Sequence, residues 1–120
     1  MMNNRKTGSY HETVAIEYLS RKGYKIIDRN VLNKCGEIDI ICLSDKNELV
    51  FAEVKYRSSD KAGDPLEAVD ARKIRKICKA SAAYINYHHE YSDYQVRYDV
   101  IGVYENNEIR HIENAFFYEV

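Results

Sequence analysis

Two hydrophobic runs that each contain charged residues are the feature that most constrains the fold of this chain. The segment CGEIDIICLSDKNELVFAEVKYR, residues 35–57, reads as two strands joined by a turn at SDKNE. Asp39 lies within the first run, and Glu53 and Lys55 lie within the second. Because an apolar side chain would pack better at each of these positions, the three charges call for a specific role.

Strand periodicity predicts where these charges point. Successive side chains of a strand face opposite sides of a sheet, so Asp39 is expected to share a face with Ile41, with Ile38 on the other face. Glu53 and Lys55 likewise share one face of the next strand. If the hairpin brings the two charged faces together, the three charges cluster at one end of it.

This cluster has the composition of a hydrolytic metal site. Two carboxylates on adjacent strands repel each other, and burying them without compensation costs several kcal/mol. Mg²⁺ or Mn²⁺ prefers such hard oxygen ligands and removes the repulsion, so Asp39 and Glu53 are the expected metal ligands. Lys55 can orient or activate a water and stabilise negative charge on a phosphoryl oxygen. Glu12, near the edge of the apolar stripe of the first expected helix, would complete the acidic cluster.

A simpler interpretation stays open at this point. The same charges could lie on the solvated face of an edge hairpin and form a cross-strand salt bridge. The apolar residues that share their faces favour a half-buried pocket instead. The D-x13-E-x-K spacing alone is only moderately specific and does not decide between the two interpretations.

The composition indicates one globular domain, residues 1–120, with 45% hydrophobic and 31% charged residues. No apolar stretch approaches the roughly 20 residues that cross a bilayer, and no secretory leader follows the polar start MMNNRKTG. The three irregularly spaced cysteines fit reduced thiols. We therefore expect a cytoplasmic protein with no membrane partner.

The net charge of −1 does not predict a strong nucleic-acid binder, but the charges are unevenly distributed. Lys and Arg outnumber Asp and Glu in residues 1–79, and the reverse holds in residues 80–120. If the carboxylates of the first part surround a metal, that part presents a basic rim to its partner.

The remaining elements follow from periodicity and capping signals. A helix capped by Thr7 or Ser9 is expected to end at Gly23 and to be followed by three strands. Asp64 and Pro65 then start a long helix that reaches Tyr87, with a core stripe of Ala71, Ile74, Cys78, Ala82 and Ile85. Two further strands close the chain. The order α-β-β-β-α-β-β predicts an α/β fold, a mixed β-sheet flanked by two main helices.

The motifs TGxxxE, GEIDII, FAEVKYR, DARK, RYDV and HIENAF give the chain a resemblance to a known family. It resembles the YraN-type family of uncharacterised bacterial proteins, described as predicted endonucleases distantly similar to archaeal Holliday junction resolvases. The resemblance extends from about Thr7 to Phe116 and implies a restriction-endonuclease-like fold with the signature (P)D-x(n)-(D/E)-x-K. Asp39, Glu53 and Lys55 match that signature, and Glu12 matches the helix glutamate of resolvase-like members.

The resemblance implies a Mg²⁺- or Mn²⁺-dependent endonuclease that acts on DNA, with branched or junction DNA as the candidate substrate. Arg57, just beyond Lys55, and Lys73, on the second helix, are the candidate phosphate contacts. Because two symmetric cuts need two sites, a junction nuclease would act as a homodimer. The alternative is a catalytically silent nucleic-acid-binding or protein-interaction module on the same fold. Arg97 and Asp99 are expected to pair with each other or a neighbour, and the histidines are assigned no role.

Overall fold

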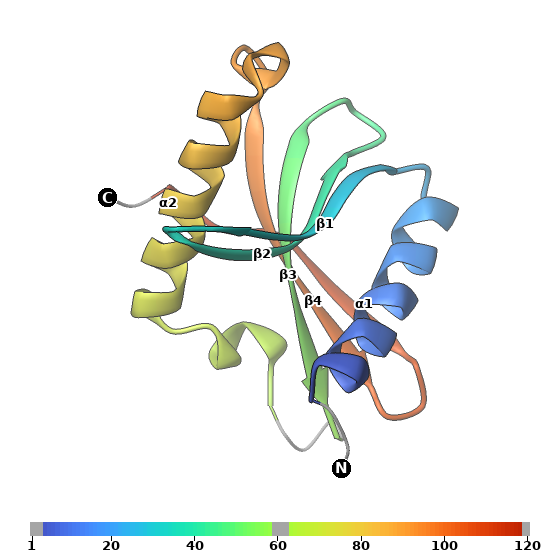
Figure 1. Cartoon of the computed structure of the whole chain (residues 1–120). Helices are drawn as coiled ribbons and strands as arrows, with labels where there is room; N and C mark the ends of the chain where they lie inside the picture. Colours follow the sequence, from blue (N-terminus) through green and yellow to red (C-terminus); the bar gives the residue numbers. More distant parts are fainter. Residues whose placement is uncertain (1–3, 59–62, 119–120) are drawn as a thin grey trace.

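The structure, a computed structural model, describes residues 4–58 and 63–118. The elements occur in the expected order (Figure 1). They are α1 (Asn4–Arg21), β1 (Lys25–Asn33), β2 (Gly36–Leu43), β3 (Leu49–Arg57), η2 (Pro65–Ala68), α2 (Ala71–Tyr87), η3 (His89–Tyr91), β4 (Val96–Tyr104) and β5 (Ile109–Phe116), where η denotes a short 3-10 helix.

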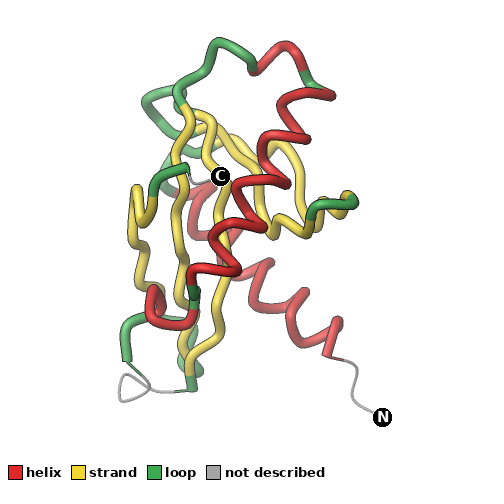
Figure 2. The backbone as a smooth tube through the Cα atoms, turned by 90° about the vertical axis from the view of Figure 1, so that its left-hand side faces the viewer, coloured by secondary structure: helices red, strands yellow, loops and turns green. Residues whose placement is uncertain are grey.

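The five strands form one mixed sheet in the order β1-β2-β3-β4-β5. Neighbouring strands are antiparallel except β3 and β4, which are parallel. Between these two strands α2 carries the chain back to the end of the sheet at which β3 begins, so β4 runs in the same direction. The two long helices cover opposite faces of the sheet, with α2 crossing the front in Figure 2. The expected α/β arrangement of a mixed sheet between two main helices is confirmed. Among the helices described, none is long and apolar enough to cross a membrane.

Each helix covers its own hydrophobic core. Beneath α1 the buried side chains include those of Leu19, Ile40 and Val50. Beneath α2 they include those of Phe51, Ile77 and their neighbours. The central strands are therefore buried on both faces, as expected for strands that lie between two layers of helix.

The first helix begins at Asn4, so the expected caps Thr7 and Ser9 lie within it. Its end agrees with the sequence. Gly23 follows the last turn with φ of 89°, a conformation that glycine adopts without strain.

The second expected helix is two elements instead of one. Asp64 caps only the short helix η2, where its Oδ1 accepts a hydrogen bond from the Leu66 amide at 2.9 Å. Val69 is extended, and α2 starts after Asp70, whose Oδ1 accepts the Lys73 amide at 2.9 Å. Each aspartate is a good N-cap, so each starts a helix of its own, and the extended Val69 separates η2 from α2.

The buried face of α2 differs in part from the expected core stripe. Cys78 is buried and Ile74 and Ile85 pack against the core as expected, but Ala71 and Ala82 are exposed. The buried residues of α2 are Ile77, Cys78, Ala80, Ser81 and Tyr84. The expected stripe is therefore confirmed at three of its positions and wrong at Ala71 and Ala82.

The two strands β2 and β3 separate halfway along their length, and this separation positions the site. Their ladder ends at the Ile40–Ala52 pair. Beyond it the β1–β2 hairpin turns toward α2 (Figure 1). There the Asn33 side chain donates a hydrogen bond to the Ala80 carbonyl at 3.2 Å. Ile38 consequently joins the core beneath α2 with Ile41, so its predicted opposite orientation is wrong. In the described sheet the end of β3 pairs only with β4.

A close contact between η2 and β4 gives a test of this packing. A Cβ atom added at Gly102 would lie 2.2 Å from Cγ of the buried Pro65. We expect Gly102→Ala to lower the free energy of unfolding by about 1–3 kcal/mol, the usual cost of overpacking, in urea denaturation. The cost should be smaller in a Pro65→Gly background, which lacks the ring. An equal cost in both backgrounds would contradict the contact.

Candidate active site

A pocket of about 230 Å³ lies where β2 leaves β3. It brings together five of the six site residues predicted from the sequence. Its lining consists of His11, Glu12, Asp39, Glu53, Val54, Lys55, Tyr56 and Lys73. Arg57, the sixth predicted residue, is the last residue of β3 and does not line the pocket.

Asp39 occupies the place where the ladder stops. Its Oδ2 accepts a hydrogen bond from the Val54 amide at 2.8 Å, so a side chain satisfies a backbone donor near the point where the strands part. Burial and the adjacent Glu53 carboxylate raise the pKa of Asp39 to about 8, against the opposing effect of the Val54 hydrogen bond. The Asp39 carboxyl group therefore retains its proton near neutral pH unless another positive charge replaces it.

Glu53 is the most buried of the three acids, with 4% of its side chain exposed. Its Oε2 lies 3.3 Å from Nζ of Lys55 and also 3.3 Å from Nζ of Lys73. Lys55 comes from the same strand and Lys73 from the first turn of α2. Lys73 is thus a constituent of the pocket, beyond the surface phosphate contact expected from the sequence.

Glu12 reaches the pocket from α1 and is 9% exposed. Its buried Oε1 accepts no hydrogen bond from the described residues, and Nη2 of Arg29 lies 3.8 Å away. Burial raises the pKa of Glu12, while a hydrogen bond with Asn30 opposes the shift. A buried acceptor without a hydrogen bond is costly, and it marks a position where a ligand would be stabilised.

The residues of the pocket fit a hard divalent cation by their chemistry. They offer carboxylate oxygens from three elements, one of them lacking a hydrogen bond, around a buried pair whose repulsion a cation would relieve. No group of three Asp, Glu, His or Cys residues in the described part of the chain is already arranged around a metal position. Lys55 and Lys73 supply the positive charge in the structure itself.

Two aromatic residues of the pocket were not predicted from the sequence. The His11 ring stacks on the Tyr56 ring with centroids 4.3 Å apart and planes at 14°. Alternation along β3 places Tyr56 on the face opposite Lys55. Both nevertheless border the pocket, because the edge of β3 is open there. Only the unpredicted separation of β2 from β3 could have revealed this.

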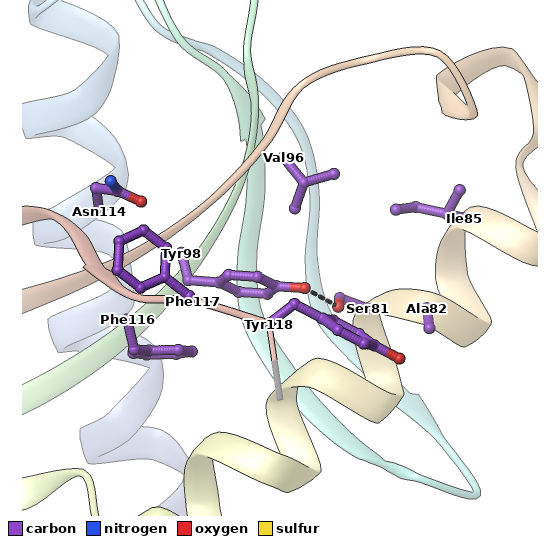
Figure 3. A pocket seen from close by; sticks show the side chains of 9 residues that line it. All are labelled: Ser81, Ala82, Ile85, Val96, Tyr98, Asn114, Phe116, Phe117 and Tyr118. Carbon is purple, nitrogen blue, oxygen red and sulfur yellow. Dashed lines mark hydrogen bonds between the residues drawn. The ribbon is translucent and has the colours of Figure 1, made fainter. Parts of the chain in front are cut away.

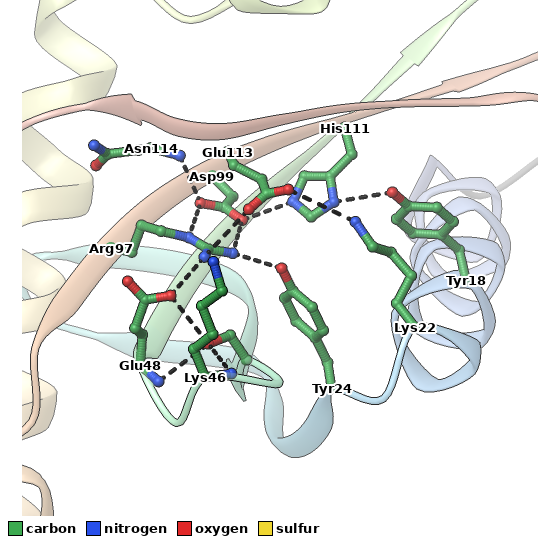
Figure 4. Close-up of polar contacts among 11 residues, drawn as sticks. Tyr18, Lys22, Tyr24, Lys46, Glu48, Arg97, Asp99, His111, Glu113 and Asn114 are labelled. Carbon is green, nitrogen blue, oxygen red and sulfur yellow. Dashed lines mark hydrogen bonds and ion pairs between the residues drawn. The ribbon is translucent and has the colours of Figure 1, made fainter.

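A second cluster of charges lies in the core near the C-terminal end of α1 (Figure 4). Arg97 and Asp99 pair through two contacts, Nε to Oδ1 at 2.9 Å and Nη2 to Oδ2 at 2.8 Å, which confirms the expected pair. His111, which was assigned no role, lies with Nε2 2.6 Å from Asp99 Oδ2 and Nδ1 3.0 Å from the Tyr18 hydroxyl. Burial alone would raise the pKa of Asp99, but hydrogen bonds with His111 and Arg97 lower it.

A larger pocket, of about 400 Å³, lies between α2 and the strands β4 and β5 (Figure 3). Its lining is mostly apolar and includes Tyr98, Phe116 and Phe117, with no Asp, Glu, Lys, Arg or His among the lining residues. The Tyr98 hydroxyl and Ser81 Oγ are 2.7 Å apart and satisfy each other. The pocket lacks groups for phosphoryl chemistry, so the smaller pocket is the candidate active site.

The coupling of the two buried acids predicts how Asp39 titrates. Carbon-13 NMR of the Asp39 carboxyl carbon should give a pKa of about 8 in the wild type. Glu53→Gln removes the neighbouring charge, so the pKa of Asp39 should fall but remain above its ordinary value because burial persists. Glu17→Gln, an exposed change on α1, should leave it in place. A normal pKa for Asp39 in the wild type would contradict the buried pair.

Comparison with known proteins identifies the family of the chain. A profile described as "Uncharacterised protein family UPF0102" matches residues 11–103. A UPF0102 protein of Caldanaerobacter subterraneus subsp. tengcongensis is 46% identical over 121 residues, covering 96% of this chain and 98% of its own. A UPF0102 protein of Fusobacterium nucleatum subsp. nucleatum is 45% identical, covering 94% and 92%.

A solved structure with a detectable likeness is that of a repair endonuclease from Pyrococcus abyssi. The TM-score is 0.43 at 14% identity, over 89% of this chain and 41% of that chain. This chain therefore spans about two fifths of the length of that protein. The sequence relatives agree with the resemblance to a family of uncharacterised bacterial proteins. The chain belongs to the uncharacterised protein family UPF0102.

Proposed function

We propose that the pocket at the β2–β3 separation hydrolyses phosphodiester bonds in DNA with Mg²⁺ or Mn²⁺ as the cofactor. The observation that carries the proposal is the adjacent pair of the half-buried Asp39 and the buried Glu53, with Nζ of Lys55 3.3 Å from Glu53 Oε2. These carboxylates lie on β2 and β3, the arrangement that the restriction-endonuclease-like resemblance implies. Glu12 enters the same pocket from the first helix.

Each residue has a role that its position supports. Asp39 and Glu53 would hold the cation, and Glu12, whose buried Oε1 accepts no hydrogen bond from the described residues, would be a third ligand. When bound, the cation supplies positive charge at the phosphoryl oxygens and lowers the pKa of a bound water. Lys55 donates hydrogen bonds that orient the attacking water and stabilise negative charge on the phosphate.

The DNA substrate is proposed from the same pocket. Lys73 lies in the pocket and Arg57 follows at the end of β3, so both can contact phosphates next to the scissile bond. Branched or junction DNA is the proposed substrate form, and a homodimer would supply the two sites for symmetric cuts. The proposed location is the cytoplasm.

One observation favours a second function, a nucleic-acid-binding or protein-interaction module without hydrolysis. The Glu53 carboxylate already contacts two ammonium groups, from Lys55 and Lys73, which is how a purely structural ion pair would be satisfied. In that function the same lysines would hold the strands and α2 together, and no cation would be required.

A cleavage assay separates the two functions. Wild-type protein is incubated with fluorescent four-way junction, duplex and single-stranded DNA in Mn²⁺, with chelator as the control. We expect cleavage that Lys55→Met reduces about 10²–10³-fold, the usual cost of removing one hydrogen-bond donor that stabilises charge in the transition state. Lys73→Met, which removes the second ammonium at the same 3.3 Å distance, should reduce it less.

Glu53→Gln should abolish cleavage and the exposed Glu17→Gln should preserve it. DNA binding without cleavage of any substrate would establish the silent module. Cleavage that persists at the wild-type rate in Glu53→Gln would place the chemistry elsewhere.

A further inference from the structure

Aromatic side chains border the carboxylate pocket on the side of α1. Tyr56 lines the pocket and is 45% exposed, although its ring stacks on His11. Tyr10 is 53% exposed and meets the His11 ring edge-on, with centroids 5.5 Å apart. Both half-exposed tyrosines contact the ring of His11, which lines the pocket, so exposed aromatic surface gathers beside the carboxylates.

The aromatic group is held in position by several contacts. The Tyr10 hydroxyl oxygen accepts a hydrogen bond from Nδ2 of Asn107, in the turn between β4 and β5, at 3.0 Å. The His11 ring lies nearly parallel to the Tyr56 ring, with planes at 14° and centroids 4.3 Å apart, so it supports one face of Tyr56. The group therefore consists of preoriented rings, and 45% of Tyr56 stays exposed although His11 stacks on it.

We propose that Tyr56, backed by His11, is a stacking platform for an unpaired nucleobase of the substrate. The proposal rests on the proposed function, and it names the substrate class as DNA with at least one unpaired base beside the phosphate in the pocket. Base–aromatic stacking is the usual way in which proteins hold single strands, and bases within a duplex are not available for it.

The geometry of β3 couples the platform to the chemistry. Lys55 and Tyr56 are consecutive residues on opposite faces of the open edge of β3, and both line the pocket. A strand laid across this edge would place a phosphate near Lys55 and Glu53 on one face and a base near Tyr56 on the other. An intact duplex lacks an unpaired base to occupy the second position.

The test is binding, measured by fluorescence anisotropy without divalent metal so that no cleavage occurs. The probes are a fluorescein-labelled single-stranded oligonucleotide and the same sequence as a duplex. We expect Tyr56→Ala to weaken single-strand binding about tenfold, the typical effect of losing one stacked base, and to change duplex binding less than about twofold. Tyr56→Phe should bind like the wild type because it keeps the ring.

Two further variants exclude a trivial loss of folding. Tyr56→Leu keeps apolar bulk without an aromatic face, and it should behave like Tyr56→Ala. Tyr87→Ala removes a tyrosine that is 78% exposed at the end of α2, outside the pocket, and should bind both probes normally. Circular dichroism and thermal unfolding confirm that each variant is folded.

The outcomes separate this proposal from the nuclease itself. Single-strand binding that is unchanged in Tyr56→Ala, or lost equally for both probes, overturns the platform even if Glu53-dependent cleavage is found. Selective loss of single-strand binding supports the platform even if no cleavage is found. A wild-type protein that binds neither probe at low salt overturns the platform, and the cleavage assay on junction DNA in Mn²⁺ then decides separately on the nuclease.

Discussion

The carboxyl group of the half-buried Asp39 lies next to that of the buried Glu53, and the positive charge or proton that compensates them determines what the pocket can do. In the structure the compensation has two parts: the raised pKa of Asp39, which keeps its proton, and the ammonium groups of Lys55 and Lys73 at Glu53. A single divalent cation could compensate both carboxylates in place of the proton and the ammonium groups. Because the cation competes with that proton, its affinity should rise with pH through the titration of Asp39.

The separation of β2 from β3 makes this arrangement possible. If the ladder continued past Ile40 and Ala52, backbone groups would fill the space in which the carboxylates meet. Instead, the Val54 amide donates a hydrogen bond to the Asp39 side chain, and the edge of β3 stays open to a ligand. The β1–β2 hairpin offsets the lost pairing with contacts to α2, which is the helix that delivers Lys73.

The two charge clusters differ in how their acidic side chains are compensated. Burial alone would raise the pKa of Asp99, but hydrogen bonds from Arg97 on β4 and His111 on β5 lower it. In the carboxylate pocket the pKa of Asp39 is raised, and Oε1 of Glu12 accepts no hydrogen bond from the described residues. Strongly perturbed acids are typical of functional sites, whereas a fully compensated network is typical of a core.

Local patterns predicted most of the fold, and long-range geometry accounts for the differences. Strand alternation and the turn residues gave the strands and their order, because those signals act over a few residues. The restart of α2 at Asp70 was missed because two good caps compete and only tertiary packing decides between them. His111 looked isolated because its partners lie 12 and 93 residues away in sequence.

The acidic residues and Lys55 of the candidate site could be predicted from the sequence. A charged residue within a hydrophobic strand is costly to bury, so it stands out in the sequence. The aromatic side of the pocket was not. His11 and Tyr56 lie in different elements, and their stacking depends on how α1 packs against the end of β3. No pattern within either segment encodes that contact.

Calorimetric titration of Mn²⁺ measures metal binding at the pocket without assuming a substrate. We expect wild-type protein and the exposed variant Glu17→Gln to bind Mn²⁺, and Asp39→Asn and Glu53→Gln not to bind it. The titration is repeated with single-stranded DNA present, because phosphate oxygens can complete the coordination of the cation. Mn²⁺ binding that is absent under both conditions, or that persists unchanged in both pocket variants, would contradict the account.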